Sequence, residues 1–266
     1  FGFYPRTLGS WAFDAHTLDY AAGRFGLDAA CNCKEQWGTD GYTIWGGYYG
    51  QGYYPSKRNA LCPAQTAERQ IGVPVFRMLG ADPVYQYDCG LDYSVQREDG
   101  AQGVVSLEPV YSGDGGGGGN PDWVEWYLQE NFNGDCVTFG YTQAGQENSF
   151  GWPAMEKGLR DQFARFEALQ AAGKLTVETM GETGRWYKES FSETPPAAIT
   201  AHDDWKRTGR KSVWYCSKNY RINLYAEDGC FWIRDLYLFR DDYPERYLDK
   251  TCNSDQLTYD NLPVAD

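Results

Sequence analysis

Short apolar runs alternate with segments of helical periodicity over roughly the first two thirds of the chain. Six runs have the length and residue types of buried strands, at residues 10–14, 27–33, 74–79, 103–108, 136–142 and 175–179. Apolar residues at helical spacing occur between them, at residues 17–25, 122–131 and 154–172. Pro121 and Pro153 stand at two of the helix starts, and Gly173 follows the last helix. Strands that alternate with helices predict a parallel sheet with right-handed crossovers.

Several predicted strands run directly into loops that carry acids and amides. Barrel enzymes place their chemistry in such loops, at the carboxyl ends of the strands. We therefore expect an α/β fold in which residues 1–198 form a (β/α) barrel-like catalytic domain, with a doubly wound sheet as the alternative architecture.

The pattern changes from about His202 onward. Two aromatic and β-branched runs, at residues 211–225 and 230–239, are separated by Glu227-Asp228-Gly229, which is a hairpin signal. Pro195-Pro196 lies in the segment just before this region and marks a boundary. Residues 199–266 are therefore predicted to form a small antiparallel, hairpin-rich annex.

Composition narrows the function classes. The chain has 266 residues, enough for one domain with an annex, and a formal net charge of −13, which does not favour nucleic acid or anionic membranes as partners. No apolar stretch approaches the roughly 18 to 20 residues that cross a bilayer. Eight cysteines leave the compartment open. Because the first residue is Phe1 rather than Met, we interpret the chain as a processed product or a piece of a longer one.

Aromatic residues make up 17% of the chain, and many stand in polar, glycine-rich segments. Rings presented this way can contact the apolar faces of sugar rings, while neighbouring amide and carboxylate groups bind hydroxyls. A loop packed on its own side chains is the alternative interpretation. The predicted substrate-binding residues are Trp37, Tyr42, Trp45, Tyr48, Tyr49, Trp152, Trp186, Asn148 and His16.

Carboxylates at strand ends are the candidates for catalysis. Glu147 is the first choice, because Asn148 can hydrogen-bond it and Trp152 can raise its pKa by excluding water. An acid placed to favour the following helix dipole is the alternative role. Its partner in a catalytic pair would be Asp14, Asp40 or Glu108, and two further acids come next, Glu178 and Glu182.

Four segments also resemble known proteins. Residues 13–17 (FDAHT), 31–42 (CNCKEQWGTDGY), 75–83 (VFRMLGADP) and 145–152 (GQENSFGW) resemble a group of bacterial proteins and, more distantly, the seven-stranded (β/α) barrels of glycoside hydrolases and polysaccharide deacetylases. The resemblance implies a barrel. Those barrels carry an acid or histidine pair on their first strand, and no such strand precedes Ser10 in this sequence. The barrel is therefore expected to be distorted or incomplete at its N-terminus. His16 and His202 do not reproduce the deacetylase metal site, which uses one Asp and two His.

These observations predict a glycoside hydrolase that acts on an oligo- or polysaccharide with a pair of carboxylates. A sugar-binding protein without catalysis is the alternative, and a metal-dependent deacetylase using Asp14 and His16 ranks last. No cofactor is expected. With two histidines and no CxxC pair, a histidine-rich or zinc-ribbon metal site is not expected either.

Overall fold

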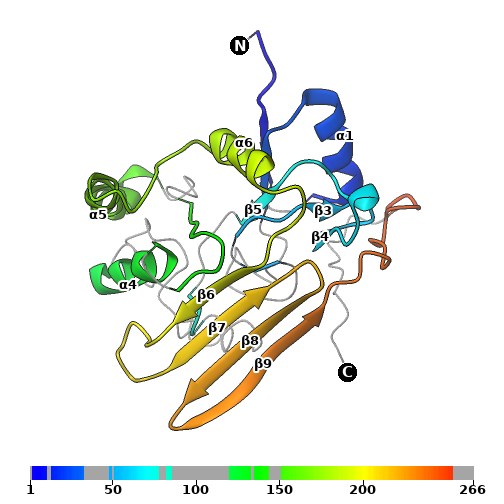
Figure 1. The fold of residues 1–266 in the computed structure, drawn as a ribbon. Coiled ribbons are helices and arrows are strands. Elements are labelled where there is room, and N and C mark those ends of the chain that lie inside the picture. The colour runs from blue at the N-terminus through cyan, green and yellow to red at the C-terminus, as the bar shows by residue number, and fades with distance from the viewer. Residues whose placement is uncertain are drawn as a thin grey trace.

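The fold was analysed in a computed structural model, which describes residues 2–10, 13–32, 48–49, 51–77, 82–85, 120–132, 135–143 and 151–253. These residues form a short parallel sheet, a small hairpin, a long antiparallel sheet and four α-helices (Figure 1). None of the described helices is long and apolar enough to cross a membrane.

The parallel sheet has the strand order β1-β2-β5, formed by β1 (Thr7–Gly9), β2 (Ala29–Asn32) and β5 (Val75–Arg77). Every residue of β2 and β5 is buried. Strands buried on both faces read as continuous apolar runs, so the sequence signal for these two strands was strong.

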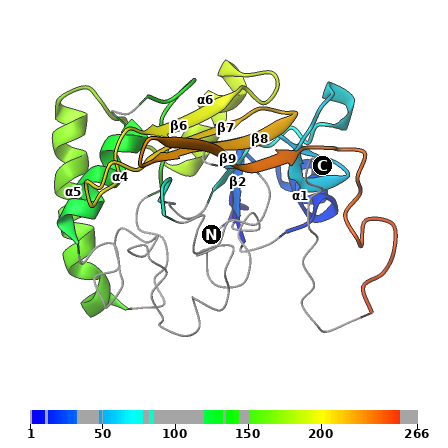
Figure 2. The same ribbon diagram turned by 90° about the horizontal axis from the view of Figure 1, so that it is seen from below.

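The second sheet is antiparallel and runs in chain order, with β6 (Ala197–Ala201), β7 (Lys211–Cys216), β8 (Tyr220–Glu227) and β9 (Cys230–Leu238). A two-residue turn joins β8 to β9, and both of its residues, Asp228 and Gly229, have positive φ angles of 51° and 74°. This is the hairpin turn that the sequence predicted. In Figure 2 the sheet is seen nearly edge-on, with β2 and α1 beneath it and α4 and α5 at one end.

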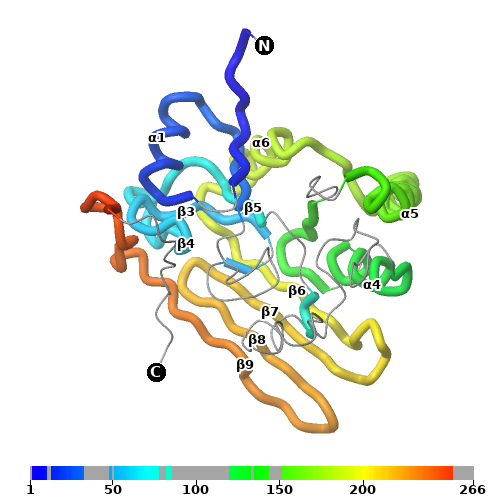
Figure 3. The backbone as a smooth tube through the Cα atoms, turned by 180° about the vertical axis from the view of Figure 1, so that it is seen from behind, coloured from blue at the N-terminus to red at the C-terminus, as the bar shows by residue number. Residues whose placement is uncertain are grey.

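The four helices have clear sequence boundaries. Helix α1 (Ala15–Phe25) begins where Asp14 accepts a hydrogen bond from Thr17 N at 2.6 Å, and α4 (Pro121–Phe132) begins with proline. Helix α5 (Trp152–Ala171) has Pro153 in its first turn, and α6 (Met180–Ser190) begins with a capping box. Seen from behind, α1 lies on the opposite side of the parallel strands from α4 and α5 (Figure 3).

A shared hydrophobic core joins the two sheets. It contains Ala30 and Val75 of the parallel sheet together with Ile199 and Trp214 of the antiparallel sheet. A small hairpin, β3 (Pro55–Ser56) with β4 (Asn59–Pro63), and the 3-10 turn η1 (Ala67–Arg69) were not predicted from the sequence, and β4 contributes residues 60–62 to this core. The predicted domain boundary between residues 198 and 199 lies inside β6, and the division into two domains stays a prediction.

Three of the six predicted strands are not strands where the sequence placed them. Of the strand predicted at 10–14, the described residues 10, 13 and 14 are not in a strand, because Asp14 caps α1; β1 lies just before them, at Thr7–Gly9. Residues 136–142 make one isolated bridge between Val137 and Ala198, and the positive φ of Thr138, 77°, bends the chain there. Residues 175–179 lead into α6, because Thr179 caps that helix.

The α/β class is confirmed, and the helices predicted at 17–25, 122–131 and 154–172 match α1, α4 and α5. The strand predicted at 103–108 lies outside the described residues. A barrel is not confirmed, because the parallel strands within the described part of the chain form an open sheet of three.

Candidate active site at the edge of the parallel sheet

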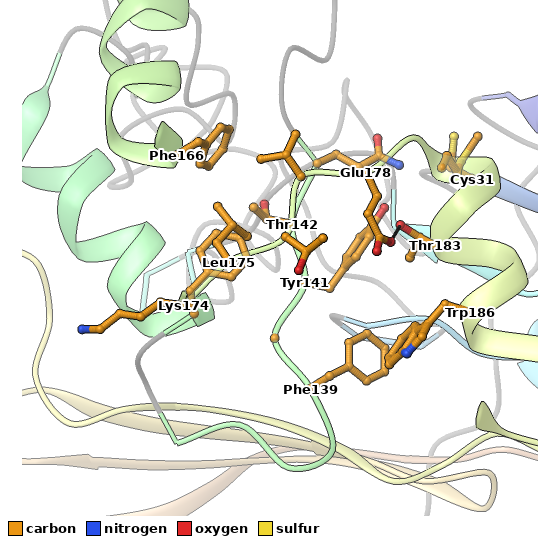
Figure 4. A pocket seen from close by; sticks show the side chains of 16 residues that line it. Cys31, Phe139, Tyr141, Thr142, Phe166, Lys174, Leu175, Glu178, Thr183 and Trp186 are labelled. Atoms are coloured by element: carbon orange, nitrogen blue, oxygen red, sulfur yellow. Dashed lines mark hydrogen bonds between the residues drawn. The ribbon is translucent and has the colours of Figure 1, made fainter. Parts of the chain in front are cut away.

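A cavity of about 620 Å³ lies between the carboxyl end of β2, the segment 139–143, the segment 174–178 and helix α6 (Figure 4). Ligand pockets commonly have volumes of about 300–1,000 Å³. In open α/β sheets, ligands bind at the carboxyl ends of the strands, and Cys31, near the end of β2, lines this cavity.

Local features of the sequence bring the two irregular segments to the cavity. A Cβ at Gly140 would lie 1.9 Å from the carbonyl oxygen of Asn131, so only glycine allows this segment to pass so close to the end of α4. On the other side, Thr179 Oγ1 accepts a hydrogen bond from Glu182 N, and Glu182 in turn accepts one from Thr179 N at 2.8 Å. This capping box fixes the start of α6 and therefore the direction from which residues 174–178 approach it.

Glu178 is the one carboxylate among the described residues that line the cavity. It accepts a hydrogen bond from Thr183 Oγ1 at 2.9 Å, which orients one of its oxygens. Figure 4 shows the Glu178 carboxylate directed toward Thr183 on the α6 side of the cavity.

Trp186 presents an aromatic surface beside this carboxylate. Its side chain is 40% exposed, and its ring packs edge-to-face on Phe139 with a centroid distance of 5.1 Å. Phe139 thereby holds the indole in place while leaving part of it open to the cavity. A carboxylate and a partly open indole in one cavity are suited to a hydroxylated ring.

Two residues of the segment 139–143, Tyr141 and Thr142, contribute hydroxyl groups to the middle of the cavity, which we call its floor. Burial raises the pKa of Tyr141 well above its ordinary value, so this phenol stays neutral and acts as a hydrogen-bonding group. The Thr142 hydroxyl is hydrogen-bonded to the Tyr127 hydroxyl of α4. The floor is therefore polar but uncharged.

Of the predicted site residues, the structure brings Trp186 into the cavity, together with Glu178 from the two further acids. Asp14 caps α1, His16 is exposed on that helix, and Trp152 is 56% exposed at the start of α5. None of these three residues lines the cavity. Glu182 belongs to the capping box of α6.

Tyr48 and Tyr49 are in a different environment from that of a sugar platform. Both are buried, and Tyr49 stacks on Trp214 at 4.2 Å in the core between the sheets. Tyr48 stacks on Tyr53 and donates a hydrogen bond to the carbonyl of Pro195. Neither ring presents an open face in this arrangement.

The other predicted site residues lie outside the described part of the chain. They are the carboxylates Glu147, Asp40 and Glu108, and the substrate-binding candidates Trp37, Tyr42, Trp45 and Asn148. Within the described ranges, no group of three or more His, Cys, Asp and Glu side chains could hold a metal ion.

Sequence reasoning missed the residues that shape the cavity walls, among them Phe139, Leu175 and Thr183. One signal was available. Thr179 followed three residues later by Glu182 is the sequence signature of a capping box, which predicts a helix start at 180 and places Thr183 and Trp186 on that helix.

No protein-family model matches the chain, and no curated protein matches it significantly. Among solved structures, the fold is similar to the crystal structure of "a putative glycoside hydrolase/deacetylase" from Parabacteroides distasonis, with a TM-score of 0.66 and 15% sequence identity. The match covers 90% of this chain and 57% of that chain, so the chain spans a little more than half the length of that protein. At this identity the likeness shows the fold alone.

Proposed function

We propose that the protein is a carbohydrate-active enzyme that hydrolyses glycosidic bonds, with the cavity beside α6 as its sugar site. The observation that carries the proposal is the placement of Glu178 beside the partly open ring of Trp186 in a cavity at the carboxyl edge of the parallel sheet. The fold likeness to a protein named as a glycoside hydrolase/deacetylase supports the same class of chemistry.

Glycoside hydrolysis needs two carboxyl groups flanking the scissile bond, about 5 Å apart for retention and about 6.5–9.5 Å for inversion. One protonates the leaving oxygen, and the other attacks the anomeric carbon or takes a proton from the attacking water. We assign Glu178 as one member. Glu147, which follows the cavity-lining Gln143 by four residues in the sequence, is our candidate for the other, with Asp40 and Glu108 as alternatives. Asp14 caps α1 outside the cavity and would act only in a different site.

The test is release of reducing ends from a panel of α- and β-linked oligosaccharides. Glu178→Gln and Glu147→Gln should each lower turnover by about 100-fold or more, because an amide can neither donate a proton as an acid nor accept one as a base. Glu189→Gln is the control, since Glu189 is exposed on α6, the helix that follows Glu178, and does not line the cavity. Full turnover in Glu178→Gln would remove the cavity as the active site.

Two further variants separate the alternatives. Asp14→Asn keeps the helix cap, because Asn and Asp cap equally well, so a loss of turnover there would assign a catalytic role to Asp14 itself. Trp186→Ala should raise KM by about tenfold through the lost ring contact, whereas removal of a more exposed ring on α1, in Tyr20→Ala, should not change it. If the folded wild type binds saccharides without any turnover, the alternative of a sugar-binding protein is favoured. If it releases acetate, the deacetylase is favoured.

A further inference from the structure

The cavity has two chemically different ends. Figure 4 shows Phe166 and Leu175 on one side and Glu178, Thr183 and Trp186 on the other, with Tyr141 and Thr142 between them. The end beside α6 carries the carboxylate and the indole of the proposed sugar site. The opposite end, between α4 and α5, has a different chemistry and is not explained by a sugar ring alone.

The α4–α5 end is formed by Phe132, Phe166 and Leu175. The two phenyl rings meet edge-to-face, with a centroid distance of 6.4 Å and an interplanar angle of 84°. Phe166 belongs to the core between these helices, while Phe132 and Leu175 are half-buried at its border. Apolar surface at the border of this core is therefore left facing the cavity.

Among the described residues at this end, the charged side chain is that of Lys174, which lines the cavity. Its ammonium group points away from the other labelled side chains in Figure 4. A sugar hydroxyl placed against Phe132, Phe166 and Leu175 would lose hydrogen bonds to water without gaining partners there, which is unfavourable. A flat apolar group gains from the same surface, because ring pairs at centroid distances of about 4.5–7 Å attract each other beyond the effect of burial.

We propose that the α4–α5 end is a subsite for a neutral aromatic aglycone, so that the substrates are aryl glycosides. The sugar end of this inference rests on the proposed function, whereas the aromatic end does not depend on it. The sugar lies against Trp186 and Glu178, the glycosidic bond lies over the polar floor at Tyr141 and Thr142, and the aryl group lies against Phe132, Phe166 and Leu175.

The first experiment measures the aromatic end without any sugar. Binding of 4-methylumbelliferone to the intact protein is followed by fluorescence polarisation in mildly acidic buffer, where its hydroxyl group is protonated. Leu175→Ala and Phe166→Leu should each weaken binding by about three- to tenfold. Phe231→Ala is the control, since Phe231 is an exposed ring on β9 and does not line the cavity. No binding by wild type, or equal binding by all four proteins, overturns the subsite.

The second experiment compares aryl, methyl and octyl glycosides of a sugar that the wild type cleaves. The subsite predicts the highest kcat/KM for the aryl glycoside and a selective loss of that preference in Leu175→Ala. A preference for the octyl glycoside overturns the aromatic assignment in favour of an acyl or alkyl chain. If no glycoside is cleaved but 4-methylumbelliferone binding depends on Leu175, the subsite stands and the proposed hydrolysis fails. If glycosides are cleaved without a preference for the aryl glycoside and 4-methylumbelliferone does not bind, the proposed hydrolysis stands and the subsite fails.

Discussion

The two sheets of this protein are built in opposite ways. The strands of the antiparallel sheet have five to nine residues, and β7 and β8 alternate between buried and less buried positions. The strands of the parallel sheet have three or four residues, and β2 and β5 are buried throughout. The antiparallel sheet therefore has one covered face, while the parallel sheet is surrounded on both.

The source of stability differs accordingly. The antiparallel sheet contains its own polar network, in which Arg221 pairs with Asp235 through two hydrogen bonds of 2.9 and 2.7 Å. The parallel sheet depends on neighbours, because Asp28 at the start of β2 receives hydrogen bonds from Arg6 and from Arg185 of α6. The antiparallel sheet therefore has a buried ion pair between its own strands, whereas the ion pairs at the parallel sheet come from the N-terminal segment and from α6.

The largest effect is expected from a substitution in the polar network of the antiparallel sheet. The Arg221 and Asp235 side chains are 0% and 2% exposed, so Asp235→Ala removes the carboxylate that pairs with a buried guanidinium and should lower the free energy of unfolding by about 3–5 kcal/mol. Urea denaturation measures this, with Asp242→Ala as the control, since the Arg240–Asp242 pair is exposed and screened by water, and its loss should change stability little. Equal small losses in the two variants would show that the buried pair does not support the sheet.

The second effect tests the packing of α6 on the parallel sheet. A Cβ at Gly184 would lie 2.4 Å from the carbonyl oxygen of Asp28 and 2.7 Å from Ala29 Cβ, so Gly184→Ala should destabilise by about 1–3 kcal/mol. Gly23 of α1 has nothing within 4 Å, so Gly23→Ala should stabilise by about 0.5–1 kcal/mol through helix propensity alone. Thermal melts of both variants check the opposite signs. A neutral Gly184→Ala would mean that α6 is not packed closely on β2.

The third effect appears near neutral pH, on α4, beside the antiparallel sheet. Burial raises the pKa of Glu130 to about 7, with Asp135 adding to the shift and His202 opposing it. The folded state therefore favours the protonated form of Glu130. The stability that this preference contributes is fully present below about pH 4.3 and is lost as the pH rises through about 7. Between pH 5 and 8 the wild type should lose about 1 kcal/mol more than Glu130→Gln in urea titrations. Parallel pH profiles for the two proteins would refute this.

The smallest expected effect concerns the parallel sheet, where a carboxylate makes stability fall rather than rise as the pH is lowered. Burial alone would raise the pKa of Asp28, but hydrogen bonds from Arg6 and Arg185 outweigh it and hold the pKa below its ordinary value. The stability this carboxylate contributes is present above about pH 3.9 and is lost as the pH falls through its lower folded-state pKa. Because both arginines are more than half exposed, the effect is at most about 1 kcal/mol. The stability advantage of the wild type over Asp28→Asn should shrink in urea titrations as the pH falls below about 3.9, and a constant difference throughout the acid range would contradict the account.

Local signals predicted the fold best where one short segment carries all the information. Asp228-Gly229 between two β-branched runs identified the β8–β9 hairpin, because a two-residue turn with positive φ angles requires residues of this kind. The first of those runs was predicted as one strand and is two, since Ser217 to Asn219 form a turn between β7 and β8. Pro153 and Gly173 bracketed α5 for the same local reason.

The candidate site was less predictable. Trp186 and Glu178 were named from the sequence, but the wall residues Phe139 and Leu175 were assigned to strands that do not form. A strand needs a partner, and an apolar run by itself does not say whether one is present. Tyr48 and Tyr49 illustrate the same limit, because a ring in a glycine-rich loop has the same sequence signal whether it faces a ligand or a core.

The sequence by itself determined the α/β class, three of the four described helices, the hairpin turn and the chemical types available for a sugar site. Each of these depends on residues within one turn or one strand of each other, where the backbone and its nearest side chains set the energy. Only the tertiary structure decided which aromatic rings are buried, that residues 139–143 and 174–178 face each other as cavity walls, and that Glu178 lies beside Trp186. Those outcomes depend on packing between segments distant in the chain, as where Gly140 passes the end of α4 and α6 packs on β2.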